Sequence, residues 1–469
     1  MKSEKHRNQK GMSWPTAAIF IVGDMMGGGM IALPIALVNA GLFPGVILII
    51  LGAIFTGYTG IQLGDNWTLM QKRWPEYKKH CRRPYPEMAY RAMGTTAKQA
   101  AVGAAISSTI AAGLIVAGAY HDAPVCSEVV TYPEFSFKNF FLAYGTIAFA
   151  YGGHGAFPTI QHDMTKPFRF NRSVYASYIC GIICDLFTVI VIVYIIVAIA
   201  GYKVYGTSMR NTVIPSLQIE WLSQLVNMMI TVHVLPTLVI VFSPLAQQVE
   251  QWTGVPTRRK LSSELMPSIC KSLIGKDHFK SHHLAENIEI IEERFTDFSL
   301  PRFVTRSLLL FGIVFTAESI PHFGVFLDLV GGSTITLMTM LLPSVFYLFL
   351  FASHKKRADL ISSMQISPDS PDDQLAGFVD IWRYTSKPLL LFNAASFVFG
   401  LLGGIAATSS AMSELLDARM APPCYVQWFT SDLHMTPPSG GSIQCCGPHM
   451  NITVNGIDPY SACIRPEYI

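Results

Sequence analysis

Charged residues are scarce in this sequence of 469 residues. Only 14% are Asp, Glu, Lys or Arg, whereas soluble proteins contain about 25%. Hydrophobic residues make up 51%, so the composition excludes an ordinary soluble protein and indicates an integral membrane protein. The formal net charge is only +3, which leaves no strong positive field to attract nucleic acid.

The sequence also lacks the short motifs that mark enzymes and cofactor sites. It contains no metal-ligand spacing of Cys and His, no glycine-rich nucleotide loop and no nucleophile elbow. We therefore expect no catalytic residue, no cofactor and no resident metal. The basic N-terminus (Lys2 to Lys10) resembles that of a signal peptide, but the apolar run after it is too long and lacks a cleavage site.

Apolar stretches of about 20 residues, the length that crosses a bilayer, recur through the chain. We expect nine transmembrane helices, near residues 15–38, 42–64, 100–120, 139–160, 174–200, 222–246, 303–320, 325–352 and 388–411. The predicted organisation is a cytoplasmic tail (1–14), a transmembrane domain (15–412) interrupted by cytoplasmic loops (65–99, 250–302 and 353–387), and a C-terminal tail (413–469).

Basic residues are concentrated in these same loops, which all lie on one side if the helices alternate. By the positive-inside rule that side is the cytoplasm, together with the N-terminus. An odd number of helices then places the C-terminus outside the cell or in a lumen. The membrane is expected to be the plasma membrane or a lysosomal or vacuolar membrane.

The predicted C-terminal tail carries features of an oxidising, glycosylating compartment. Asn451 begins an Asn-Ile-Thr glycosylation sequon. The disulfide candidates are Cys424, Cys445, Cys446 and Cys463 in the tail and Cys126 in the first outer loop. Four cysteines allow three connectivities, and the fifth also allows a bond between tail and loop. The alternative interpretation is that some of these cysteines are free thiols.

Two clusters of glycine interrupt apolar stretches. The first is Gly27, Gly28 and Gly29 in the run 14–38, and the second lies in 149–158. Glycine costs a helix interior about 1 kcal/mol relative to alanine, so we expect both helices to break. Two interrupted spans in one chain are the best sequence sign of a transporter's binding site. The alternative is that the glycines only allow close helix packing.

Broken helices expose backbone groups of opposite polarity. A half-helix that begins after Gly29 presents free N–H groups and a positive dipole end, which favour a carboxylate. Carbonyl groups freed near Gly152 to Gly155 suit an ammonium group or a cation. Together they predict an amino acid as the ligand.

Ionisable residues inside the expected spans are functional candidates, because burying a charge is costly. They are Asp24, His154, Asp185, His233, Glu318 and Asp328. Asp24, about one turn before the first glycines, is the candidate for holding a coupling ion; the alternative is a structural cap. His154, within the second cluster, either senses pH or forms a structural hydrogen bond.

Three stretches carry a family resemblance: Gly28–Pro34 with Asn39–Gly41, Phe141–Pro158 with Gln161–Met164, and Gly201–Gly206. With them the chain resembles the amino acid/auxin permeases of the APC superfamily. The resemblance implies an all-α, inverted-repeat (LeuT-like) fold with two discontinuous helices, and secondary active transport of small neutral amino acids coupled to H⁺ or Na⁺. It implies substrate contacts at Gly27, Gly28, Gly29, Met30, Ile31, Tyr151, Gly152, Gly153, His154 and Gly155.

One departure from the family matters. Its members have about eleven helices and the second broken helix is the sixth, whereas here it is the fourth. The segment 100–120 resembles the fifth helix, so the third and fourth helices are expected to be absent at the junction 99–102. The chain is then either a carrier or, alternatively, a truncated form that senses amino acids or regulates full-length family members by co-assembly.

Overall fold

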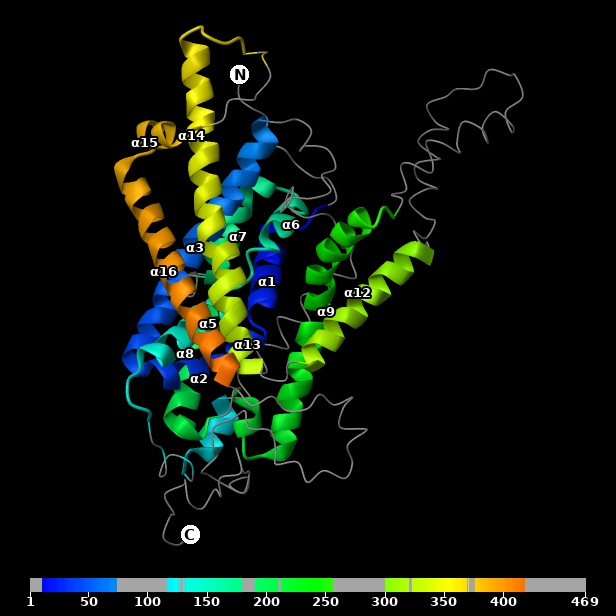
Figure 1. The fold of residues 1–469 in the computed structure, drawn as a ribbon, viewed down its shortest axis with the longest axis vertical. Coiled ribbons are helices and arrows are strands. Elements are labelled where there is room, and N and C mark those ends of the chain that lie inside the picture. Colours follow the sequence, from blue (N-terminus) through cyan, green and yellow to red (C-terminus); the bar gives the residue numbers. More distant parts are fainter. Residues whose placement is uncertain are drawn as a thin grey trace, which may run out of the picture. The chain divides into compact units, whose positions relative to one another are not determined.

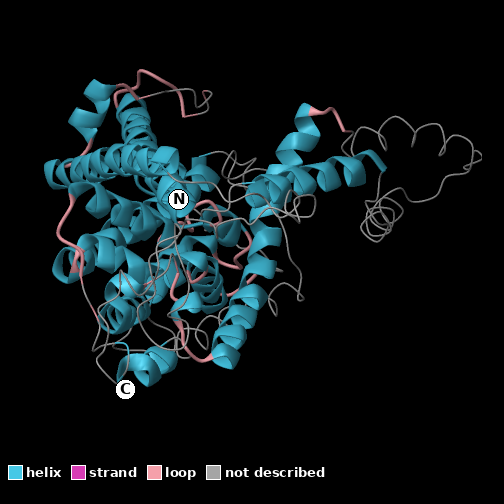
Figure 2. Cartoon of the chain, turned by 60° about the horizontal axis from the view of Figure 1, so that its bottom comes forward, coloured by secondary structure: helices cyan, strands magenta, loops and turns pink. Residues whose placement is uncertain are grey.

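The computed structural model describes residues 11–73, 116–178 without 125, 127–129 and 131, 190–255 without 210–211, 300–319, 323–368, 370 and 376–417. Within these ranges the regular elements are helices (Figure 2). The chain divides into two compact units, Met1–Val241 with Ile320–Ile469, and Phe242–Ser319. Each unit is described by itself.

The first span of the larger unit is broken, as the glycines predict. Helix α1 (Trp14–Met25) and helix α2 (Gly28–Ala40) are bent by 53° relative to each other. Helix α2 then ends at Gly41, whose φ of +85° is a conformation that glycine adopts without strain. The chain reverses there into the long helix α3 (Leu42–Arg73).

The second predicted break is also present. Helix α5 (Phe137–Ala150) ends at Tyr151, and a non-helical segment leads to the short helix α6 (Phe157–His162). Pro158 in the first turn of α6 suits this start, because its missing N–H is not needed there. The chain continues through η3 (Pro167–Arg169), α7 (Phe170–Tyr178), α8 (Ile190–Tyr205), η4 (Gly206–Ser208), η5 (Ile214–Ser216) and α9 (Glu220–Trp252).

A third irregular span follows in the larger unit. Helix α13 (Phe323–Val330) runs into two π-helical turns, η6 (Gly331–Ile335) and η7 (Leu337–Leu341), and then into α14 (Leu342–Ser362). The sequence patterns predict a single apolar helix here. Short α15 (Phe378–Tyr384) and long α16 (Lys387–Asp417) complete the described chain.

The elements of the larger unit pack around the two broken spans (Figure 1). Helix α2 packs against α5 and α8, and α5 also packs against α13, η6 and α16. Helix α3 is tied to α16 by the Gln62 amide, which donates a hydrogen bond of 2.7 Å to the Asn393 side chain. Asn393 in turn donates to the Tyr58 hydroxyl at 3.1 Å.

Backbone bonds join the start of α1 to the end of α6. The Met12 N–H donates to the Asp163 carbonyl at 2.7 Å, and the Thr165 N–H donates to the Met12 carbonyl at 2.7 Å. Met12 and Met164 thereby form a parallel bridge. Two segments more than 150 residues apart in sequence are held together at this point.

The smaller unit contains residues 242–252 of α9 and helix α12 (Leu300–Ser319). Glu250 forms ion pairs with Arg306 at 2.6 Å and Arg302 at 3.4 Å. None of the α12 residues is buried, although the helix is apolar enough to cross a membrane. A helix that is apolar on all sides is typical of a membrane span.

Among the described residues, five helices are long and apolar enough to span a membrane, or six with the bent pair α1–α2. The predicted span 100–120 and the middle of 174–200 fall largely outside the described residues, so the total of nine stays a prediction. The helices also continue past several expected ends. Helix α3 reaches Arg73 rather than residue 64, and α14 reaches Ser362 rather than 352. Polar and basic residues support a helix beyond the apolar part of a span.

Candidate functional site

The two helix breaks lie against each other. A Cβ atom built on Gly29 would lie 2.4 Å from the Cα atom of Ala150, so the start of α2 touches the end of α5. A Cβ atom on Gly153 would lie 2.7 Å from the Met25 side chain. The segment after α5 therefore touches the end of α1. The two segments predicted from separate glycine clusters are therefore in contact.

Tyr194 of α8 links the ends of α1 and α5. Its hydroxyl lies 2.8 Å from the Met25 carbonyl oxygen and 2.7 Å from that of Ala150. Each is the last residue of its half-helix, where carbonyl groups lack an intrahelical donor. The tyrosine ring is fully buried. Sequence reasoning missed this residue, because a tyrosine inside an apolar run is usually a packing residue.

The first break presents the start of a helix. The Gly27 N–H donates to the Met25 carbonyl at 2.8 Å, and the Met30 N–H donates to the Gly27 carbonyl at 3.1 Å. Helix α2 begins at Gly28, so its first amides point away from the helix body and carry its positive dipole end. Met30 and Ile31 are buried in the core, which leaves the backbone as the polar feature of this segment.

In the second break, two side chains turn toward α3. The Tyr151 hydroxyl donates to the Ile49 carbonyl at 3.0 Å. The Nε2 atom of His154 lies 2.8 Å from the Thr56 carbonyl oxygen, and its ring stacks on Phe157. These contacts anchor the segment to α3. The resemblance implies ligand contacts of the backbone here, and such contacts at Tyr151 and His154 stay a prediction.

The glycines of the second break remain accessible to different degrees. Gly155 is exposed, Gly152 is half-buried and Gly153 is buried. A Cβ atom on Gly155 would lie 3.8 Å from Met338 of η7, and one on Gly152 would lie 2.9 Å from Ile335 of η6. The π-helical turns therefore form the wall opposite this break. Gly331 and Gly332 were the sequence signal for this irregularity, and sequence reasoning did not use it.

Asp24 lies between the two breaks. Its Oδ2 atom would be 3.0 Å from a Cβ atom on Gly153, although Asp24 belongs to the first break and Gly153 to the second. The side chain is partly buried. A carboxylate in this place is able to hold a proton or bind a cation beside the glycine backbone.

The other ionisable candidates have different surroundings. His233 of α9 is buried beside Gly27, whose Cβ would lie 3.0 Å from the ring Nε2 atom. Asp328 of α13 is buried and accepts a hydrogen bond from Thr146 of α5. Glu318 is exposed on α12. Asp185 lies outside the described residues.

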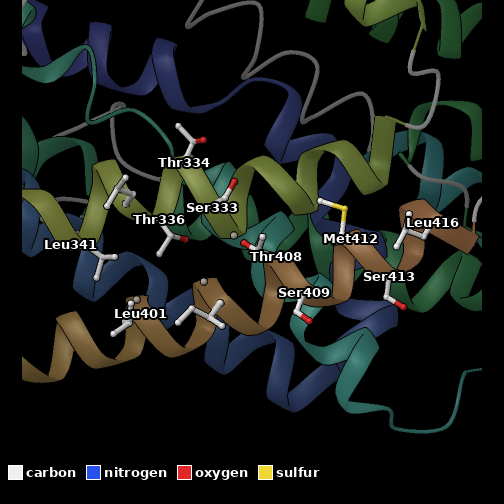
Figure 3. Close-up of a pocket in the computed structure, with 15 residues that line it drawn as sticks. Ser333, Thr334, Thr336, Leu341, Leu401, Thr408, Ser409, Met412, Ser413 and Leu416 are labelled. Carbon is white, nitrogen blue, oxygen red and sulfur yellow. The ribbon is translucent and has the colours of Figure 1, made fainter.

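A separate pocket of about 890 Å³ lies along η6, η7 and α16. Figure 3 shows Ser333 and Thr336 on one side of it and Thr408 and Ser409 of α16 on the other. None of the site residues predicted from the sequence is part of its wall. Although this pocket is large, it is separate from the glycine breaks.

Cys126 is disulfide-bonded. Every other cysteine of the sequence lies outside the described residues, so its partner does too. Cys424, Cys445, Cys446, Cys463 and the sequon at Asn451 also lie there, and their pairing and modification stay predictions.

Comparison with known proteins agrees with this architecture. Residues 10–106 and 98–366 match the family model described as transmembrane amino acid transporter protein. Amino acid transporter AVT1C of Arabidopsis thaliana is 26% identical over 208 residues, which cover 44% of this chain and 29% of the relative. Amino acid transporter AVT1I is 25% identical over 210 residues, covering 45% and 40%.

Lysine histidine transporter-like 6 of the same plant is 25% identical over 259 residues, which cover 54% of this chain and 48% of the relative. The matches thus span less than half the length of these curated relatives. The family match itself covers well over half of this chain. The chain therefore belongs to the transmembrane amino acid transporter family, and it is a multi-pass membrane protein and not an enzyme.

Proposed function

We propose that this chain is a secondary active carrier of small neutral amino acids that works by alternating access in an inverted-repeat fold. The observation that supports this most is the meeting of two broken helices, through Gly29 with Ala150 and Gly153 with Met25. Broken helices that meet within a membrane domain are typical of a transporter's substrate site.

The backbone at this site suits a zwitterion. The N–H groups of Gly28 and Gly29 favour the substrate carboxylate, because they lie at the positive end of α2. The Met25 carbonyl already accepts from the Gly27 N–H and lies beside the Tyr194 hydroxyl. The Ala150 carbonyl lies beside the same hydroxyl and keeps a second lone pair, which suits the substrate ammonium group.

Asp24 is the proposed coupling residue. It lies beside Gly153, at the point where the two breaks meet. A proton or Na⁺ on this carboxylate would neutralise it as the substrate binds, so that the charge of the site depends on both ligands. The driving ion is therefore proposed to be H⁺ or Na⁺.

The two family-model matches support an alternative. They meet at residues 98–106, where the sequence predicts that the third and fourth helices are absent. A shortened member is a candidate for an amino acid sensor or for a regulator that co-assembles with full-length members. The same site would then bind an amino acid without moving it.

Reconstitution of the full chain in proteoliposomes tests the two functions. We expect saturable uptake of a radiolabelled neutral amino acid, stimulated by a gradient of H⁺ or Na⁺. Gly28→Leu and Gly153→Leu should abolish it, because both add a side chain where the breaks meet. Gly312→Leu is the control, because a Cβ atom there meets nothing within 4 Å.

Uptake that is indifferent to both glycine substitutions would disprove the proposed site. If wild-type protein binds amino acids but shows no uptake, and a longer family member co-purifies with it, the alternative function is favoured.

A further inference from the structure

Helix α13, which packs against α5, carries a buried carboxyl group. Asp328 of α13 is 7% exposed, and its Oδ1 atom accepts a hydrogen bond from the hydroxyl of Thr146, which is 3% exposed. The two helices touch here, because a Cβ atom on Gly145 would lie 2.4 Å from the Asp328 carbonyl oxygen. Gly145 therefore permits the close approach that brings the carboxyl group to Thr146.

The charges around Asp328 do not neutralise it. Within the described residues, no basic side chain pairs with it, and the charge that acts on it is the like-signed Glu414 of α16. Glu414 is itself paired with Lys138 of α5 at 2.6 Å. Tyr144 is a further titratable residue of α5, and η6 has none. Burying an ionised carboxylate without a cation costs several kcal/mol, and binding a proton removes that cost.

The position of this pair connects it to the substrate site. Asp328 lies three residues before Gly331, where the π-helical turn η6 begins, and π-helical turns occur frequently at functional sites. Thr146 is one turn before the end of α5 at Ala150, which contacts Gly29. A charge on Asp328 would favour separation of α13 from α5, since separation lets water reach the carboxylate. Separation would also move the wall of the second break.

We propose that Asp328, with the hydroxyl of Thr146, is a proton-binding site distinct from Asp24. The bound proton keeps α13 packed on α5, and its release loosens that contact. Proton binding is a property of the pair alone, whereas its use in coupling rests on the transport function proposed above.

Infrared spectroscopy of the purified full chain in lipid tests proton binding without any transport. At neutral pH we expect the carbonyl-stretch band of a protonated carboxylic acid, and its loss in Asp328→Asn. Thr146→Val keeps the carboxyl group but removes the hydrogen bond, so the band should shift to higher frequency. Asp24→Asn is the matched control, and the band lost in Asp328→Asn should persist in it. A spectrum that Asp328→Asn leaves unchanged would overturn the proposal.

Uptake in proteoliposomes tests coupling. Asp328→Asn mimics the protonated acid, so stimulation by a proton gradient should disappear while exchange of labelled for unlabelled amino acid persists. Equal loss of exchange and stimulation would overturn the coupling role in favour of a structural one. If wild-type protein shows no uptake but has the Asp328 band, the proposed transport function fails and the proton site stands.

Discussion

The hydroxyl of Tyr194 donates a hydrogen bond of 2.8 Å to the carbonyl oxygen of Met25, the last residue of α1. The same hydroxyl lies 2.7 Å from the Ala150 carbonyl at the end of α5. One side chain of α8 thus stabilises the ends of both half-helices. The hydroxyl group therefore lies between the ends of α1 and α5.

Replacing Tyr194 with phenylalanine should therefore destabilise the protein and impair uptake. The change removes the one hydroxyl donor that the two buried carbonyl groups share, at a cost of about 1–3 kcal/mol. The Ala150 carbonyl is affected more, because the Met25 carbonyl keeps the Gly27 N–H. Thermal unfolding in detergent and proteoliposome uptake measure the two effects. Tyr202→Phe on the same helix is the control, because its ring stacks on Tyr132 and its hydroxyl has no hydrogen bond to the described residues. Equal effects of the two substitutions would refute the linking role.

Gly29→Ala should abolish folding or uptake, whereas Gly312→Ala should be tolerated. The new methyl group at residue 29 would meet the Cα atom of Ala150 at 2.4 Å, and backbone cannot move aside cheaply. At residue 312 it would meet nothing within 4 Å. Size-exclusion profiles and uptake of the two variants provide the comparison. A well-folded, active Gly29→Ala protein would contradict the close contact between the breaks.

Asn393→Leu should destabilise the contact between α3 and α16. It removes the acceptor of the Gln62 amide and leaves that buried group unpaired, at a cost of about 1–3 kcal/mol. The double variant with Gln62→Leu should lose less than the sum of the single variants, because it leaves no unpaired amide. Thermal unfolding of the four proteins in detergent gives the coupling. Strict additivity would mean that the bond contributes nothing.

We expect the contact between α14 and α15 to persist at mildly acidic pH. The Gly377 N–H, and after it Lys356 at 2.9 Å, hold the pKa of Asp380 below its ordinary value of 3.8. A lowered pKa favours the folded state where the carboxylate is ionised. Its contribution is therefore fully present above pH 3.8 and is lost as the pH falls through the lower folded-state value.

The NMR signal of a fluorine label on Trp382 of α15 reports whether α15 keeps its contact with α14. This signal should stay constant from neutral pH to about pH 4 and change only below that. In Asp380→Asn the signal should already be altered at neutral pH, with no acid transition. A transition centred at or above pH 3.8 in the wild-type protein would contradict the lowered pKa.

The broken helices were predictable from the sequence because glycine destabilises the helix at its own position. Three glycines in a row destabilise a helix whatever surrounds them, and the 53° bend at Gly27 follows from that. The all-helical architecture was predictable for the same reason, since the length of an apolar run is a local property. The family was predictable from a few short stretches around the same glycines.

The partners of each residue were not predictable. Whether His154 faces a ligand or α3 depends on the course of the non-helical segment after α5, and in the structure its ring lies 2.8 Å from the Thr56 carbonyl oxygen. Tyr194 bonds with carbonyl groups that are distant in sequence, so no spacing rule finds it. Gly331, where the first π-helical turn begins, packs closely on Gly145, and a single sequence does not show that contact.

The bridge between Met12 and Met164 reduces the number of parts that can move independently. Two backbone hydrogen bonds tie the start of α1 to the end of α6, so we expect a displacement of one to carry the other with it. Opening the site from this end would then require the two half-helices to move together or the bridge to break.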